Sequence, residues 1–188
     1  MVVNNSAQKF RILFVCTGNV CRSPIAEFLL KQKLSASPFF EVSSAGTMAL
    51  VGRPVAEEMA EVCQVNHLNV GGFKGRKLTR SIIDNSDLVL TMTSEQRRRI
   101  IEDWPDVADK TTHISNTLQL DNFGQFTPNN LKQWCLSNRP SQLKDVPDPY
   151  KQPESVAREA FTEIEHYLDL LTNWVNPKPA GRRKKAIA

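Results

Sequence analysis

Residues 16–24 of the sequence, Cys-Thr-Gly-Asn-Val-Cys-Arg-Ser-Pro, bring a thiol, a guanidinium and a hydroxyl into one short segment. Cys16 would act as a nucleophile if nearby amides and a helix dipole held its sulfur as a thiolate. Arg22 can give two parallel hydrogen bonds to two oxygens of a phosphate group, which lysine cannot match. Ser23 can donate a hydrogen bond to the sulfur when the sulfur leaves a thiophosphate. This segment therefore predicts covalent phosphoryl transfer through Cys16.

The other residues of this segment are expected to bind phosphate through their backbone amides. They are Thr17, Gly18, Asn19, Val20 and Cys21. Gly18 is expected to adopt backbone angles that a side chain would oppose. A Cys-x5-Arg string is weakly specific, and a buried cysteine followed by a surface arginine would also produce it. The position between a predicted strand and a predicted helix favours a phosphate loop.

A second segment supplies a candidate acid, because cleavage of a phosphate ester needs a proton for the leaving oxygen. Residues 145–150 are Asp-Val-Pro-Asp-Pro-Tyr, so Asp148 lies between two prolines that keep it out of the helical region. A rigid aspartate followed by Tyr150 suits a general acid beside a pocket wall. An ordinary turn before the last helix is the alternative, since Asp and Pro favour turns in any case.

The surrounding elements alternate between apolar runs of strand length and segments of helical periodicity. Strands are predicted at 10–15, 41–44, 87–92 and 110–114, and helices at 24–34, 54–62, 94–102, 129–136 and 154–175. Strands separated by helices imply a parallel sheet of about four strands with helices on both faces. Ligands bind at the carboxyl ends of such strands. We therefore expect a single α/β domain at 10–175, with the phosphate loop at its first strand–helix junction.

The charge distribution argues against a nucleic-acid-binding protein. Of the 24 basic residues five lie in 176–188, which leaves 19 basic against 20 acidic residues in the rest of the chain. The net charge of +4 therefore belongs to this last segment. We expect a basic, disordered tail; contact with an anionic lipid surface is the alternative.

The remaining composition favours a soluble, cytoplasmic protein. An N-terminal arm at 1–9 has neither the basic start nor the apolar run of a signal peptide. The longest apolar stretch is far shorter than a membrane span. Four cysteines without a CxxC pair indicate neither a disulfide scaffold nor a structural zinc site.

The loop at 16–24 and Asp148-Pro149-Tyr150 together resemble the low-molecular-weight protein tyrosine phosphatases. The similarity continues through 43–47, 76–79, 87–92 and the last helix. It implies that Cys16 attacks phosphorus, that Arg22 binds the phosphoryl oxygens, and that Asp148 acts as acid and then as base. It also implies that no metal or cofactor is used.

The same resemblance implies supporting roles. Asn19, Ser23 and Ser44 match residues that hold the shape of the loop. Cys21 matches a second loop cysteine that can form a reversible disulfide with Cys16 and protect it from over-oxidation.

The substrate walls expected from the resemblance are Leu50 and Tyr150. Phe73 stands where many relatives have a histidine that bonds the loop asparagine. Leu50 and Lys151 resemble bacterial members tied to tyrosine kinases that control exopolysaccharide. The implied partners are a phosphotyrosine protein and a bacterial tyrosine kinase.

Two rival functions are open at this point. A thiol-dependent arsenate reductase can share the loop and fold, but it relays a disulfide through further cysteines, for which Cys63 and Cys135 are the only candidates. A non-catalytic phosphate- or phosphotyrosine-binding module would need the loop and Arg22 without the acid.

Overall fold

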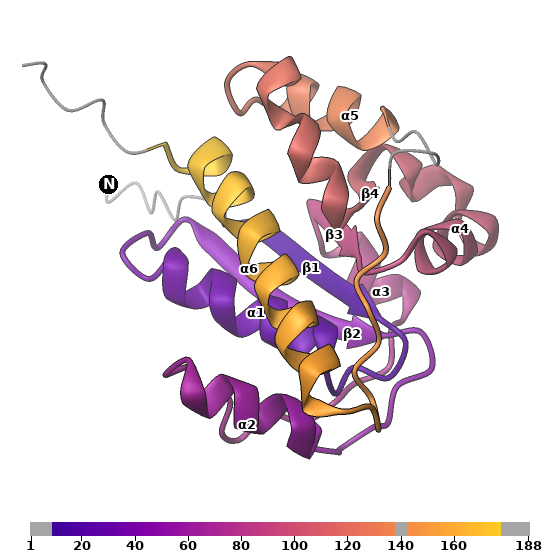
Figure 1. Ribbon diagram of the computed structural model, residues 1–188. Coiled ribbons are helices and arrows are strands. Elements are labelled where there is room, and N and C mark those ends of the chain that lie inside the picture. The colour runs from indigo at the N-terminus through magenta and orange to yellow at the C-terminus, as the bar shows by residue number, and fades with distance from the viewer. Residues whose placement is uncertain (1–8, 138–142, 178–188) are drawn as a thin grey trace, which may run out of the picture.

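The structure, a computed structural model, describes residues 9–137 and 143–177 (Figure 1). Four strands form one parallel sheet in the order β2-β1-β3-β4. Their bounds are β1 Phe10–Cys16, β2 Phe40–Gly46, β3 Leu88–Thr91 and β4 Thr111–His113. The sequence analysis predicted all four strands to within two residues at each end. The predicted α/β class is therefore confirmed.

The described helices, which connect the strands or follow the last one, include two 3-10 segments. The α-helices are α1 Arg22–Lys33, α2 Glu57–Val65, α3 Arg80–Asp84, α4 Ser94–Asp103, α5 Pro128–Leu136 and α6 Glu154–Val175, and the 3-10 segments are η1 Pro105–Lys110 and η2 Ile114–Phe123. The bounds of α6 are those that its apolar spacing predicts. The short helix α3 and both 3-10 segments were not predicted; α3 has only five residues, too few to show an apolar period.

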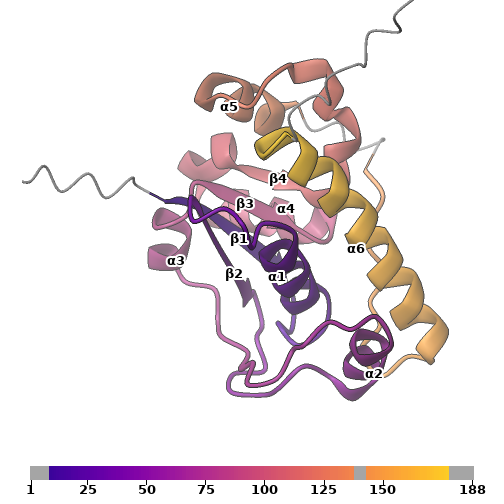
Figure 2. The ribbon, with the colours of Figure 1, turned by 90° about the vertical axis from the view of Figure 1, so that its left-hand side faces the viewer.

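Helices cover both faces of the sheet, as predicted. Alternate side chains of β1 enter two separate apolar clusters, Ile12 and Phe14 in one and Leu13 and Val15 in the other. The larger cluster includes residues of α1, α2, α5 and α6, and the smaller one includes residues of α3 and α4. Figure 2 shows α3 on one side of the sheet and α1 and α6 on the other. A strand buried on both faces explains the unbroken apolar run of β1.

The sheet positions the candidate site at one edge. Cys16 is the last residue of β1, and it is in register with Gly46 at the end of β2. The segment at 143–153, orange in Figure 1, runs toward this same end of the sheet before α6 begins. The loop after β1 and the Asp148 segment therefore meet, although more than a hundred residues separate them in the sequence.

The first turn of the helix predicted at 54–62 is not helical. Residues 47–56 form an irregular connection instead, and α2 begins at Glu57. The reason is tertiary, because the backbone amides of this connection bond to the loop after β1.

Among the described helices, none combines the length and the apolar character needed to cross a bilayer. The predicted arm at 1–9 and tail at 176–188 lie almost wholly outside the described residues.

Candidate active site

The loop between β1 and α1 is fixed through its carbonyl groups. Four of its carbonyl oxygens accept hydrogen bonds of 2.8–3.0 Å from amides of the 47–56 connection: Cys16 from Thr47, Thr17 from Met48, Gly18 from Leu50 and Val20 from Ala56. By contrast, the amides of Gly18, Val20, Cys21 and Arg22 have no backbone or side-chain acceptor in the described part of the chain. Unpaired amides gathered in one turn at a helix start form an anion-binding concavity.

The left-handed residue of this loop is Asn19, with φ of 52°, and not Gly18. The prediction that Gly18 provides the unusual backbone angles is therefore wrong. Asparagine is one of the few side chains that tolerate this conformation. The glycine that the loop does need is Gly46 on β2, where a Cβ atom would lie 2.5 Å from the carbonyl oxygen of Thr17.

The side chain of Asn19 is fully buried and uses both ends of its amide. Its Nδ2 donates to Ser23 Oγ and Ser44 Oγ, each at 2.9 Å. Its Oδ1 accepts from the amide of Arg76 at 2.8 Å. These bonds tie the loop to α1, to β2 and to the segment before α3. Both ends of the Asn19 amide thus have partners, and none of them is Phe73.

The thiol of Cys16 lies at the floor of the loop, with the residue only 2% exposed. Its Sγ accepts from the amide of Asn19 at 3.3 Å and lies 2.9 Å from Ser23 Oγ. In the second cysteine of the loop, Cys21, burial and then the neighbouring Cys16 raise the pKa of the thiol well above the usual range. Both are free thiols in this structure. The surroundings thus favour a neutral sulfur at Cys21, whereas the Sγ of Cys16 lies within hydrogen-bonding distance of two polar groups of its own loop.

Arg22 is 4% exposed, and its guanidinium group contacts the segment at 143–153. Its Nη1 donates to the carbonyl of Val146 at 3.1 Å, and its Nη2 lies 2.7 Å from Asp148 Oδ2. The buried Nε has no hydrogen-bond partner in the described part of the chain. An orphaned buried guanidinium N–H costs free energy unless an anion binds there.

The second segment is held at the ends of β3 and β4. The amide of Val146 donates to the carbonyl of Met92 at 3.0 Å. Asp145 Oδ1 accepts from the amide of Ser94 at 2.7 Å and lies 3.1 Å from His113 Nε2. Asp148 therefore projects from an anchored backbone, with its side chain half exposed.

These groups surround a cavity of about 200 Å³. Residues 16–18 and 20–22 form its floor, and Met48, Leu50, Asp148 and Tyr150 form its walls. The structure thus brings together the predicted nucleophile, arginine, acid and both predicted walls. Asn19, Ser23 and Ser44 do not line the cavity; they lie behind the loop, in the bonds described above.

Sequence analysis missed several residues that contribute to this site. Met48 forms a wall and carries no motif. Gln96 is buried, and its Nε2 donates to the hydroxyl of Thr17 at 3.1 Å while its Oε1 accepts from the amide of Thr93. Thr93 and Gln96 form a capping box at the start of α4. The Thr-x-x-Gln spacing is the one signal that could have identified Gln96.

The other two cysteines lie away from the cavity. Cys63 on α2 and Cys135 on α5 are both fully buried. Burial raises the pKa of the Cys63 thiol to about 12 and that of Cys135 still higher. In the part of the chain that the structure describes, no three His, Cys, Asp or Glu side chains are grouped so as to hold a metal ion.

Comparison with known proteins agrees with this geometry. The chain is 35% identical over 154 residues to the low molecular weight protein-tyrosine-phosphatase Etp of Escherichia coli K12, covering 82% of this chain and 86% of the relative. It is also 35% identical over 162 residues to a protein-arginine-phosphatase of Geobacillus stearothermophilus, covering 86% and 93%. Its fold is similar to the tyrosine phosphatase Wzb of Escherichia coli K30, solved in complex with sulphate, with a TM-score of 0.70, 28% identity and 88% and 98% coverage.

A sequence model described as low molecular weight phosphotyrosine protein phosphatase matches residues 11–180, which include both segments of the cavity. Since that match spans nearly the whole described chain and relatives with the same activity class align over most of their length, this chain belongs to the low molecular weight phosphotyrosine protein phosphatase family and is a phosphatase.

Proposed function

We propose that this phosphatase hydrolyses phosphotyrosine in proteins through a phosphate bound covalently to Cys16. The observation that carries the proposal is the arrangement at the cavity floor. Cys16, the residues with unpaired amides and Arg22, whose Nε has no hydrogen-bond partner among the described residues, all line the floor of one cavity. A phosphoryl group bound there would satisfy the amides and Nε while its phosphorus faces the sulfur.

In the first step the sulfur of Cys16 attacks phosphorus, and the bond from phosphorus to the tyrosine oxygen breaks. Asp148 gives its proton to that oxygen, so the leaving group departs as a neutral phenol. The loop amides and Arg22 hold the three equatorial oxygens, over which charge is spread in the transition state.

In the second step Asp148, now ionised, takes a proton from a water molecule. The water oxygen attacks phosphorus, the phosphorus–sulfur bond breaks, and inorganic phosphate leaves. Ser23 Oγ lies 2.9 Å from the sulfur and can donate a hydrogen bond to the thiolate as it departs. The role of Ser44 and Asn19 is to keep Ser23 and the loop in place.

The walls support an aromatic substrate. Apart from Asp148, the side chains that border the cavity above its floor are Met48, Leu50 and Tyr150. Apolar walls favour a phenyl ring, and a ring between them would place its phosphate on the buried sulfur. A phosphoserine side chain is shorter and would leave these walls without contact.

Phosphoarginine is the second candidate, because one relative at 35% identity is a protein-arginine-phosphatase. A phosphorylated guanidinium carries hydrogen-bond donors that need acceptors in the wall. Asp148 is the one carboxylate that lines the cavity in the described part of the chain, and it is bound to Arg22. The apolar walls therefore favour tyrosine over arginine.

The two rivals raised by the sequence have less support. Cys63 and Cys135 are buried outside the cavity with neutral thiols, so neither is placed to receive a disulfide from Cys16 as an arsenate reductase requires. A phosphate-binding module has no need of Asp148 at the mouth. A bacterial tyrosine kinase as partner, and a link to exopolysaccharide, stay predictions.

A panel of peptides of one sequence tests the proposal. The peptides carry phosphotyrosine, phosphoserine or phosphoarginine at the same position, and released phosphate is measured. We expect phosphotyrosine to be hydrolysed with the highest kcat/KM. Preference for phosphoarginine would reassign the substrate while keeping the phosphate loop.

The covalent step is tested by Cys16→Ser, which should abolish turnover and still bind vanadate. Cys63→Ala is the control, because it removes a buried thiol outside the cavity and should leave turnover in place. Trapping with the phosphotyrosine peptide and mass spectrometry should find phosphate on Cys16. Turnover by Cys16→Ser near the wild-type rate would contradict the mechanism.

A further inference from the structure

Three consecutive arginines on α4 differ in what they contact. Arg97 is half-buried, and its Nε donates to the carbonyl of Thr111. Arg98 is exposed and paired with both Glu95 and Glu102. Arg99 is exposed too, but in the described part of the chain it forms no ion pair. It is therefore the one arginine of the three whose charge is available to a partner.

The position of Arg99 is at the mouth of the cavity. Its Nη1 lies 3.9 Å from Met48 Sδ, and Met48 is a wall of the cavity. Met48 is 64% exposed, and Val51 in the same connection is 67% exposed. Met48 and Leu50 line the cavity and Val51 follows Leu50 in the chain; we call these three exposed apolar residues the rim, and the guanidinium of Arg99 contacts its Met48. The rim is continuous with the wall that the substrate ring would contact.

On the Tyr150 side of the cavity mouth, one side chain is positively charged and one is negatively charged. Lys151 lies with its Nζ 5.4 Å from the centre of the Tyr150 ring, which is the other wall. Its backbone amide donates to Glu58 Oε1 at 2.6 Å, so a carboxylate is already adjacent. The peptide backbone at Lys151 thus has a carboxylate bound to it on this side of the mouth. On the Arg99 side, the pKa of Glu95 is lowered first by its hydrogen bond from Arg98 and less by Arg99, so this carboxylate is engaged chiefly by Arg98.

We propose that the rim formed by Met48, Leu50 and Val51, with Arg99 beside it, binds the substrate segment next to the phosphotyrosine and selects for a carboxylate side chain there. This inference rests on the proposed function, because it requires a phosphotyrosine in the cavity. The occupant is an extended peptide with an acidic residue within a few positions of the phosphotyrosine. Its backbone lies across the rim while its carboxylate pairs with Arg99.

The test uses three phosphotyrosine peptides of equal length with Glu, Gln or Lys at the positions two before and two after the phosphotyrosine. The kcat/KM of each peptide is measured. For each enzyme variant, the value for the Glu peptide is divided by the value for the Gln peptide. We expect a ratio of about two to five for the wild type at low salt, the range of an exposed ion pair. About 1 M salt, where the Debye length is about 3 Å, should bring the ratio close to one.

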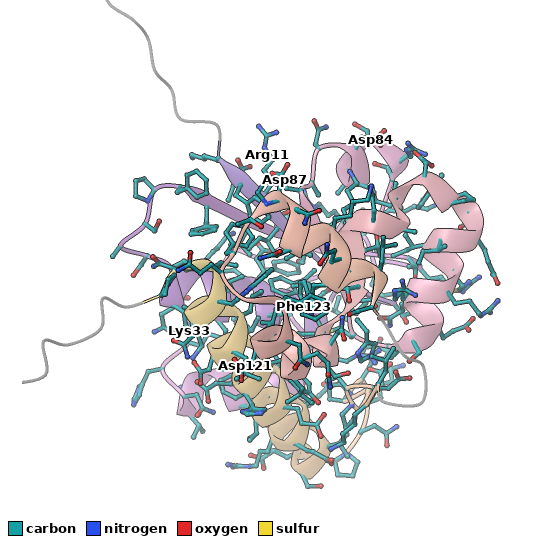
Figure 3. The ribbon with its side chains drawn as sticks, turned by 90° about the horizontal axis from the view of Figure 1, so that it is seen from above. Arg11, Lys33, Asp84, Asp87, Asp121 and Phe123 are labelled. Atoms are coloured by element: carbon teal, nitrogen blue, oxygen red, sulfur yellow. The ribbon has the colours of Figure 1, made fainter. Side chains whose placement is uncertain are left out.

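Two substitutions of Arg99 and one control identify the charge responsible. Arg99→Gln should remove the preference, and Arg99→Glu should reverse it in favour of the Lys peptide. The control is Arg11→Gln, which makes the same change of charge on an exposed arginine. Arg11 is the second residue of β1, about 16 Å along the strand from Cys16, beside Asp87 in Figure 3. Arg11→Gln should keep both the activity and the wild-type ratio.

The proposal is overturned if Arg99→Gln keeps the wild-type ratio, or if Arg11→Gln reduces it as much. If the wild-type enzyme hydrolyses none of the three peptides, this result contradicts the proposed function instead. In that event the affinities of the same peptides for Cys16→Ser, with and without Arg99→Gln, measure the Arg99 contact by fluorescence anisotropy. Equal affinity for the Glu and Gln peptides there would also overturn the proposal.

Discussion

Arg22 Nη2 and Asp148 Oδ2 lie 2.7 Å apart although 126 residues separate them in the sequence. The pair joins the group proposed to bind phosphate to the group proposed to protonate the leaving oxygen. A doubly charged phosphoryl group would compete with the carboxylate for Nη2. Binding of substrate would then release the carboxyl group of Asp148 from Arg22, which leaves it available to the leaving oxygen in the first step.

Replacement of Asp148 by Asn should separate binding from proton transfer. Asp148→Asn removes the acid and the competing charge, so kcat for phenyl phosphate should fall about 100-fold or more. The fall should be smaller for p-nitrophenyl phosphate, whose leaving group needs less protonation. The inhibition constant of vanadate should be unchanged or lower. An equal fall in kcat for both esters would exclude Asp148 as the general acid.

Arg22→Lys should not rescue the function of Arg22. Lysine keeps the charge, but it cannot bind two phosphoryl oxygens and the carbonyl of Val146 in one plane. We expect kcat/KM for p-nitrophenyl phosphate to fall by about 100-fold or more, in the range found when one transition-state donor is removed. A lysine variant within about threefold of wild type would show that the charge alone is sufficient.

Asn19 offers a matched pair of substitutions, because its backbone and its side chain have separate roles. Asn19→Gly and Asn19→Ala both remove the bonds to Ser23, Ser44 and the amide of Arg76. Each should lower the free energy of unfolding by about 1–3 kcal/mol, because buried partners lose their bonds. Alanine at φ of 52° should cost about 1–2 kcal/mol more than glycine. Urea denaturation measures this difference, and equal stability of the two variants would mean that the loop relaxes.

His113 should make the stability of the fold depend on pH. Burial lowers the pKa of its imidazole, against the opposing effect of Asp145, while Arg97 acts in the same direction as burial. In the unfolded chain a histidine takes up its proton near pH 6.5. Neutral His113 therefore makes its full contribution to the free energy of unfolding above about pH 6.5. This contribution falls as the pH drops below that value.

The measurement is the free energy of unfolding of the wild type minus that of His113→Gln, from pH 7.5 to pH 5. In this difference, the contributions of all groups that titrate in the same way in both proteins cancel. The difference should decrease as the pH falls. A difference that grows toward pH 5 would mean that His113 is protonated in the folded protein and ion-paired with Asp145.

The sequence was sufficient for the parts of the site that a local pattern describes. The apolar run of β1 identified a buried strand, and the loop after it contained a nucleophile and an arginine at a recognisable spacing. The 22-residue helix α6 carries a long apolar stripe, so even its ends were predicted. Asp148 could be singled out because two prolines restrict its backbone.

The parts that were missed depend on contacts between distant segments. Asn19 adopts the left-handed conformation because its side chain is held by groups 4, 25 and 57 residues away. No local pattern could have distinguished it from Gly18. His113 had no recognisable context, because its partner Asp145 lies 32 residues later. The irregular path at 47–56 also follows from its bonds to the loop and not from its own residues.

The 47–56 connection holds the phosphate loop through main-chain groups alone. Almost any amino acid at Met48 or Leu50 can provide the amide that the loop requires. The side chains at these positions are therefore able to diverge during evolution while the chemistry at phosphorus stays intact. Related enzymes can acquire new substrates by exchanging these side chains, whereas insertions, deletions or prolines in this stretch would threaten turnover itself.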